Sequence, residues 1–249
     1  MGESNHRIHP VYTEEIAMDA SYGMAQGIPV VSLGVGARAT FIMRTYLHLV
    51  GAMLGFVAVE MVLFSTGVAY SLAEAMLGVS WLLVLGGFMV VGWFASRAAF
   101  NARSLPAQYG ALIAFVLAEA IIFVPLLVVA QLYAPGAIES AAVVTILGFA
   151  GLTGVVFVTR KDFSFLGSVL RWGFIVALVL IVAAVLFGFE LGTFFSVGMI
   201  ALAGGAILYD TSNVLNHFPE DRYVGAALEL FASVALLFWY VLRLFMSRE

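Results

Sequence analysis

Long apolar runs separated by short polar breaks dominate the chain from about residue 45 to its end. Seven runs approach the ~20 residues that an α-helix needs to cross the hydrocarbon core of a bilayer. They are Thr45–Val68, Leu77–Ala95, Tyr109–Leu132, Ala141–Val158, Ser168–Phe187, Leu191–Val214 and Val224–Phe245. A helix satisfies its own backbone hydrogen bonds in lipid. The pattern therefore predicts an all-α integral membrane protein with seven transmembrane helices.

The breaks between these runs are short and rich in turn residues such as Pro and Gly. None is long enough to divide the chain, so residues 41–249 are predicted to form one transmembrane domain. Residues 1–40 are mixed in polarity, and their one apolar stretch, Ile28–Gly36, is too short and too rich in Gly for the core of a signal peptide. We expect residues 1–40 to form an uncleaved tail on the cytoplasmic side.

The basic residues predict the orientation. Nine of the eleven Lys and Arg residues lie on the side of the predicted N-terminal tail, and the loops after the first, third and fifth runs contain none. Only Arg243 and Arg248, at the C-terminus, lie on the other side. Because cytoplasmic loops carry an excess of Lys and Arg, we expect a cytoplasmic N-terminus and an exoplasmic C-terminus.

Composition agrees with a lipid environment. Hydrophobic residues make up 63% of the 249 residues and charged residues 10%, with a mean hydropathy of +1.07. A soluble domain carries roughly 25% charged residues. The net charge of −4 and the lack of a Lys/Arg cluster argue against a nucleic-acid partner. The chain has no Cys, which excludes disulfides and thiolate metal sites, and no cofactor is expected.

Four acids fall inside predicted spans, where an ionisable group costs at least about 2.5–3.5 kcal/mol and needs an explanation. With the spans placed in this orientation, Asp210, Glu229 and Glu119 lie at a similar depth in the membrane. Arg97, at the cytoplasmic end of the second span, lies near that depth. The hypothesis is that these acids and Arg97 form a polar, proton-sensing cluster that opens toward the cytoplasm. Alternatively, Arg97 and Glu229 snorkel to water at the interface. Glu60, in the outer half of the first span, fits either interpretation.

Two groups of polar residues accompany these acids. Glu229 and Ser233 are four residues apart, so they share one helical face. Around Asp210, the run Tyr209-Asp210-Thr211-Ser212-Asn213 offers hydroxyls and an amide that can hydrogen-bond the carboxylate. Hard cations take oxygen ligands of this kind, so calcium near Asp210, bound or permeant, is a possibility that the spacing alone does not decide.

Enzyme motifs are missing. The sequence contains no His-Glu-x-x-His zinc motif and no Gly-x-Ser-x-Gly elbow. An intramembrane aspartyl protease needs two embedded aspartates, and only Asp210 qualifies, since Asp162 and Asp221 fall in predicted loops. We therefore expect that the protein is not an enzyme.

Two stretches are more specific: residues 159–167, Thr-Arg-Lys-Asp-Phe-Ser-Phe-Leu-Gly, and residues 205–213, Gly-Ala-Ile-Leu-Tyr-Asp-Thr-Ser-Asn. Together with Arg44-Thr45-Tyr46, they resemble the Bax inhibitor-1 family and, within it, the bacterial YccA-type branch. The resemblance runs from about residue 40 to the end of the chain. It implies a seven-helix fold in which the last helix is central and wrapped by the other six.

The resemblance also implies a function. Members of the family form a proton-sensitive calcium leak controlled by buried aspartates on the sixth and seventh helices and an arginine on the second. The YccA-type branch instead associates with, and restrains, the membrane-anchored AAA protease FtsH, which implies a place in the bacterial inner membrane. Asp210 matches the sixth-helix aspartate and Arg97 corresponds to the arginine. The seventh-helix aspartate is replaced by Ser233, which weakens the calcium-leak interpretation, because a shared-proton pair needs two acids.

Three hypotheses remain open from the sequence. The first is a modulator of a membrane quality-control protease, and the second is a pH-sensitive calcium or cation leak channel in which Glu229, or else Glu119, replaces the missing acid. The third is an accessory subunit of another membrane complex. Co-purification of the protease after mild detergent extraction would favour the first, and flux through the purified protein alone would favour the second.

Overall fold

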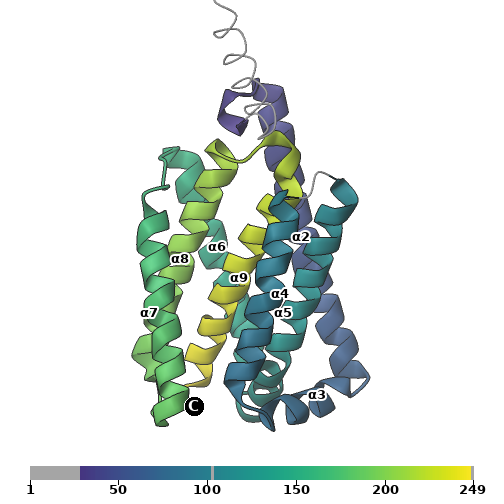
Figure 1. Cartoon of the computed structure of the whole chain (residues 1–249), viewed down its shortest axis with the longest axis vertical. Helices are drawn as coiled ribbons and strands as arrows, with labels where there is room; N and C mark the ends of the chain where they lie inside the picture. The colour runs from purple at the N-terminus through teal and green to yellow at the C-terminus, as the bar shows by residue number, and fades with distance from the viewer. Residues whose placement is uncertain (1–28, 102–103, 248–249) are drawn as a thin grey trace, which may run out of the picture.

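The computed structural model describes residues 29–101 and 104–247, and every regular element in these ranges is helical. Seven long helices run up and down the molecule, and one short helix crosses one end (Figure 1). The long helices are α2 (Val35–Ser65), α4 (Trp81–Asn101), α5 (Leu105–Tyr133), α6 (Ala137–Thr159), α7 (Leu166–Phe187), α8 (Gly192–Asn216) and α9 (Tyr223–Met246), and the short one is α3 (Val68–Leu77). Two 3₁₀ turns, η1 (Val30–Ser32) and η2 (Glu220–Arg222), precede α2 and α9.

Six of the described helices are long and apolar enough to cross a membrane: α2, α5, α6, α7, α8 and α9 with the turn before it. The pair α3 and α4 passes the same test only as one bent unit, which raises the number of candidate spans to as many as seven. The hydropathy pattern therefore predicted an all-helical membrane protein correctly.

The first apolar run differs most from its prediction. The helix begins ten residues earlier, at Val35, so residues 35–40 of the predicted tail are helical, while residues 1–28 of that tail lie outside the described residues. At the other end α2 stops at Ser65, because Gly67 adopts a left-handed conformation with φ of +78°. The apolar residues that follow form α3 instead of continuing the span.

α9 is the most buried of the helices that can span. It packs against α2, α4, α5, α6 and α8. Two core clusters include its side chains: Leu228, Leu230 and Phe231 pack toward α2 and α5, whereas Leu237, Val241 and Leu242 pack toward α5, α6 and α8. In contrast, Leu170 and Ala177 are the buried residues of α7. An apolar helix that leaves most of its side chains uncovered has the composition of a lipid-facing helix.

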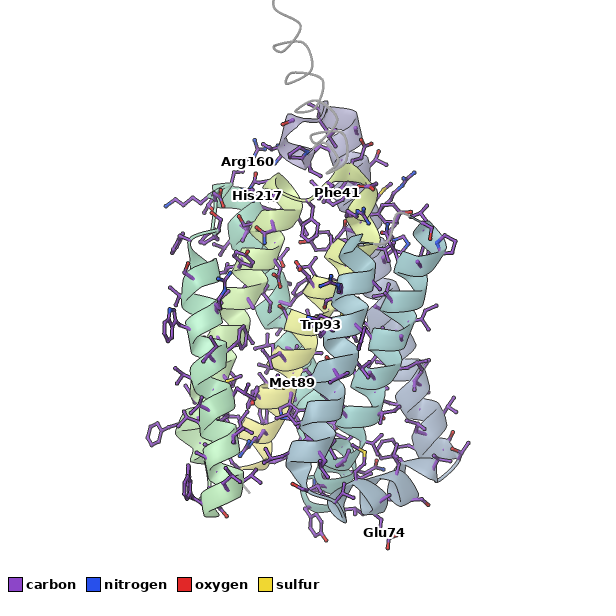
Figure 2. The ribbon with its side chains drawn as sticks, viewed as in Figure 1. Phe41, Glu74, Met89, Trp93, Arg160 and His217 are labelled. Atoms are coloured by element: carbon purple, nitrogen blue, oxygen red, sulfur yellow. The ribbon has the colours of Figure 1, made fainter. Side chains whose placement is uncertain are left out.

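The segment before α2 is held against the turn between α8 and α9. The Val30 N–H donates to the Phe218 carbonyl at 2.9 Å, and the Arg38 guanidinium donates to the Leu215 carbonyl at 2.8 Å. These bonds join the start of the described chain to the end of α8, at the end of the molecule where Phe41, Arg160 and His217 lie in Figure 2.

Candidate functional site

The buried contact between Asp210 of α8 and Ser233 of α9 is the centre of the candidate site. The Ser233 hydroxyl donates to the Asp210 Oδ2 atom at 2.5 Å, and the two residues are 8% and 7% exposed. A hydrogen bond to a carboxylate is among the stronger ones. The bond therefore gives the Asp210 carboxyl a partner on the neighbouring helix.

The residues around Asp210 face different neighbours, because successive residues of an α-helix are rotated by about 100°. The ring of Tyr209 lies against Gly167, where an added Cβ would come within 2.9 Å of a ring carbon. Ser212 accepts a hydrogen bond from the Phe163 N–H at 2.9 Å. Thr211 is fully buried. Any side chain at position 167 would press against the Tyr209 ring.

The loop between α6 and α7 is anchored to the end of α8. The Asp162 Oδ1 atom accepts bonds from the Ser164 N–H at 2.9 Å and the Ser212 hydroxyl at 3.3 Å, and its Oδ2 atom lies 3.4 Å from His217 Nε2. The Ser164 N–H holds the pKa of Asp162 below its usual range. The two sequence stretches that carried the family resemblance therefore contact each other directly.

A cavity of about 320 Å³ adjoins the Asp210–Ser233 pair. It is lined by α4, α7, α8 and α9. Glu229, one helical turn before Ser233, is half-buried and also lines this cavity. Among the predicted site residues, Asp210, Glu229 and Ser233 are thus brought together.

Glu119 and Arg97 do not line this cavity. Glu119, which is buried in α5, lines a neighbouring cavity of about 1060 Å³, which Glu190 and Arg243 also line. The two cavities share Ala232 and Leu236 in their walls. Arg97 is exposed, and its guanidinium lies 5.4 Å from the ring centroid of Trp93, which is labelled in Figure 2. Neither ion pair found in the described chain involves Arg97. Of the charged residues that the sequence placed at one depth, Asp210 and Glu229 therefore share a cavity.

The donor set near Asp210 does not resemble a built calcium site. Ca²⁺ takes 6–8 oxygen ligands, whereas this cavity has two carboxyl groups, and one oxygen of Asp210 already accepts from Ser233. Among the described residues, no group of three or more His, Cys, Asp or Glu side chains could hold a metal ion.

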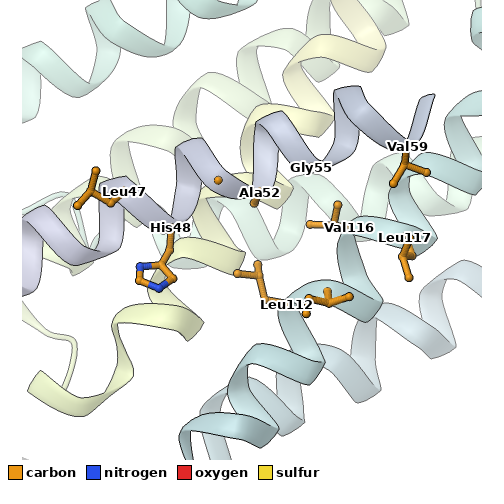
Figure 3. A pocket seen from close by; sticks show the side chains of 10 residues that line it. Leu47, His48, Ala52, Gly55, Val59, Leu112, Val116 and Leu117 are labelled. Atoms are coloured by element: carbon orange, nitrogen blue, oxygen red, sulfur yellow. The ribbon is translucent and has the colours of Figure 1, made fainter. Parts of the chain in front are cut away.

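The groove in Figure 3 lies between α2 and α5 and measures about 370 Å³. It has fewer polar lining residues than the cavity at Asp210. His48 is its polar side chain, and both ring nitrogens are engaged, with the Arg44 carbonyl and the Tyr109 hydroxyl, each at 2.7 Å. The other lining residues are apolar or glycine.

Sequence reasoning left Glu60 outside the site, and the structure gives it a distinct environment. It is 7% exposed, and neither carboxyl oxygen has a hydrogen-bond partner in the described part of the chain. A Glu inside an apolar run was the only signal in the sequence, and it did not show whether the side chain faces lipid, water or protein.

Comparisons with known proteins agree with the motifs. The family model described as "Inhibitor of apoptosis-promoting Bax1" matches residues 38–249. "Uncharacterized protein PA2604" of Pseudomonas aeruginosa is 36% identical over 111 residues, which cover 43% of this chain and 49% of that protein. "Modulator of FtsH protease YccA" of Escherichia coli K12 is 36% identical over 108 residues, covering 42% of this chain and 49% of the relative. A protein of Escherichia coli O6:H1 with the same figures is named "Inner membrane protein YccA".

The matched segments span about half the length of each of these relatives. The family model, in contrast, covers the chain from the first turns of α2 to its end. On that match, the chain belongs to the Bax inhibitor-1 family.

Proposed function

We propose that the protein is a multi-pass inner-membrane protein that modulates a membrane-anchored AAA protease of the FtsH type, in membrane protein quality control. The observation that carries this proposal is the 36% identity over 108 residues to a relative named as a modulator of FtsH protease. Such a role needs a binding surface and no catalytic group, so we do not propose an enzyme.

The partner of Asp210 supports this choice. Where the resemblance implies an aspartate in calcium-leak members, Ser233 donates to Asp210, so the α8–α9 contact has one acid and one hydroxyl. A hydroxyl does not titrate in the physiological range, so this contact cannot share a proton between two carboxyls. The contact then serves to hold α8 against α9.

We further propose seven spans, with α3 and α4 together forming the second, α9 in the centre, the N-terminus in the cytoplasm and the C-terminus outside. The contacts of α9 with five other helices support the central position. Arg160 lies at the same end of the molecule as His217 and Phe41 in Figure 2, as expected for a basic cytoplasmic end.

The test is association with the protease. The tagged full-length chain is extracted from bacterial membranes in mild detergent, and the half-life of a membrane substrate of the protease is measured with and without the chain. We expect the protease to co-purify and the substrate to persist longer. An unrelated multi-pass protein expressed to the same level is the control. An unchanged half-life without co-purification would refute the proposal.

A second function, a pH-sensitive calcium or cation leak, is favoured by one observation: Asp210 and Glu229 line the same cavity. Here Glu229 replaces the missing acid. Cation flux into liposomes that contain only the purified protein, measured from pH 5 to 8, tests this role. Glu229→Gln should abolish the pH dependence, while Glu119→Gln, in the other cavity, should leave it unchanged. A pH dependence that survives Glu229→Gln excludes Glu229 as the replacement.

A further inference from the structure

The buried carboxyl of Glu60 receives no hydrogen bond from the described residues. Its two oxygens are both buried and both lack a hydrogen-bond partner. Burying a polar group costs free energy unless it is hydrogen-bonded, and the large majority of buried polar side-chain atoms in proteins have a partner. An unpaired carboxyl inside an apolar helix therefore indicates that something else supplies the missing donor.

The carboxyl lines a cavity large enough to hold such a donor. The cavity measures about 430 Å³ and is lined by residues of α2, α5, α6 and α9. Small-molecule sites in proteins typically have volumes of about 300–1,000 Å³ and mostly apolar walls with a few polar groups. The volume and the polarity of this cavity both fall in that class.

A second unpartnered group lines the same cavity. Thr145 of α6 is 3% exposed, and its hydroxyl also lacks a hydrogen-bond partner in the described residues. Gln131 and Glu139 are the other polar lining residues. The unsatisfied polar atoms thus come from two helices, α2 and α6, that both contribute to one space.

Aromatic rings form much of the remaining wall. They are Phe56, Phe64, Phe123, Phe231 and Phe238, from α2, α5 and α9. Aromatic faces attract cations, most strongly where water is excluded. The cavity therefore combines a carboxyl that lacks a donor with a wall that suits both a hydrocarbon body and an ammonium group.

We propose that this cavity binds a small amphiphile that carries a protonated amine. The ammonium group donates to the Glu60 carboxylate, the Thr145 hydroxyl adds a polar contact, and the hydrocarbon part packs against the phenylalanine rings. No lining residue is shared with the cavity at Asp210. The inference is therefore independent of the proposed protease modulation and of the leak.

The test uses the full-length chain in nanodiscs and two probes of the same shape, 1-aminoadamantane and the neutral 1-adamantanol, in calorimetric titrations. We expect saturable binding of the amine and weaker binding of the alcohol to the wild-type chain. Glu60→Gln should weaken amine binding by about tenfold or more and leave alcohol binding within about twofold, because the charge is lost and the shape is kept. Thr145→Val should weaken amine binding by a smaller factor.

Glu74→Gln is the matched control, because Glu74 is exposed on α3. It should leave the affinity for both probes unchanged. Equal affinity of the wild-type chain for amine and alcohol would overturn the proposal without any variant. Unchanged amine binding in a Glu60→Gln protein that retains its melting temperature would overturn it as well. So would calcium binding that Glu60→Gln abolishes in a chain that does not bind the amine.

Discussion

Asp210 and Glu60 are both carboxyl groups buried within apolar helices, but their surroundings differ. Asp210 accepts a hydrogen bond at its Oδ2 atom from Ser233 of α9, so the protein supplies a partner for it. Glu60 faces a cavity, and neither of its oxygens has a partner in the described chain. Their exposed fractions are nearly equal, at 8% and 7%.

The difference shows that burial alone does not define the role of an intramembrane acid. A carboxyl that is satisfied across a helix pair contributes to helix association, because breaking the pair would leave it alone in hydrocarbon. A carboxyl that is left unsatisfied lowers stability until a ligand reaches it. The sign of the stability change on substitution distinguishes the two cases.

The largest effect is expected for Ser233→Ala. The substitution leaves the Asp210 carboxyl buried without its donor, which should lower the free energy of unfolding by about 1–3 kcal/mol. Denaturant titration in detergent micelles measures this change. The control is Ser247→Ala at the exposed end of α9, where the hydroxyl donates to the Leu244 carbonyl. If both variants lower the free energy of unfolding by similar amounts, the Ser233–Asp210 hydrogen bond does not stabilise the fold more than an exposed one.

Glu60→Met is expected to act in the opposite direction. It replaces an unsatisfied carboxyl by an apolar side chain of similar length, so the free energy of unfolding should rise by about 1–2 kcal/mol in the absence of ligand. The same titration measures it. Glu74→Met on exposed α3 should change the value by less than about 0.5 kcal/mol. A loss of stability in Glu60→Met would show that Glu60 is satisfied in the folded protein.

Ser233→Asp tests the effect of a second carboxyl placed beside Asp210. It creates the pair of acids that the resemblance implies for calcium-leak members, and two carboxyls at hydrogen-bond distance titrate as a coupled pair. We expect pH-dependent cation flux in liposomes to increase by about tenfold, which corresponds to about 1.4 kcal/mol. Ser233→Asn, of similar size but without charge, should not increase it. Equal flux in both variants would show that the cation leak does not depend on a pair of acids at this contact.

The smallest effect is expected at Asp162, a carboxyl outside the spans. Its pKa lies below the ordinary value of 3.8, chiefly because the Ser164 N–H bonds to the carboxylate. The carboxylate therefore stabilises the fold above that ordinary value, and the contribution is lost as the pH falls through the lowered pKa. The side chain is half exposed, so Asp162→Asn should cost at most about 0.5–1 kcal/mol.

Melting temperatures of the wild-type chain and Asp162→Asn, recorded between pH 2 and 6, check this prediction. The difference between them should be present at pH 6 and vanish at the acidic end. A difference that is independent of pH would assign the effect to lost packing of the loop instead of its charge.

Much of the fold could be predicted from the sequence. The apolar runs identified the long helices, because hydropathy over about 20 residues reports directly on a lipid environment. The break at Gly67 was missed, and α3 with it. The oxygen-rich run around Asp210 could be noticed in the sequence, because such a run is unusual in an apolar helix. Its pairing with Ser233 required the α8–α9 contact.

Sequence position determined how deep each acid lies in its helix, since depth follows from about 1.5 Å of rise per residue. Only the tertiary structure decided which acids meet. Asp210 and Glu229 share a cavity, while Glu119 lines another and Arg97 lies over Trp93. The physical reason is that partners depend on how each helix is rotated about its axis and on which helix lies beside it. Packing between helices sets both, and depth alone sets neither.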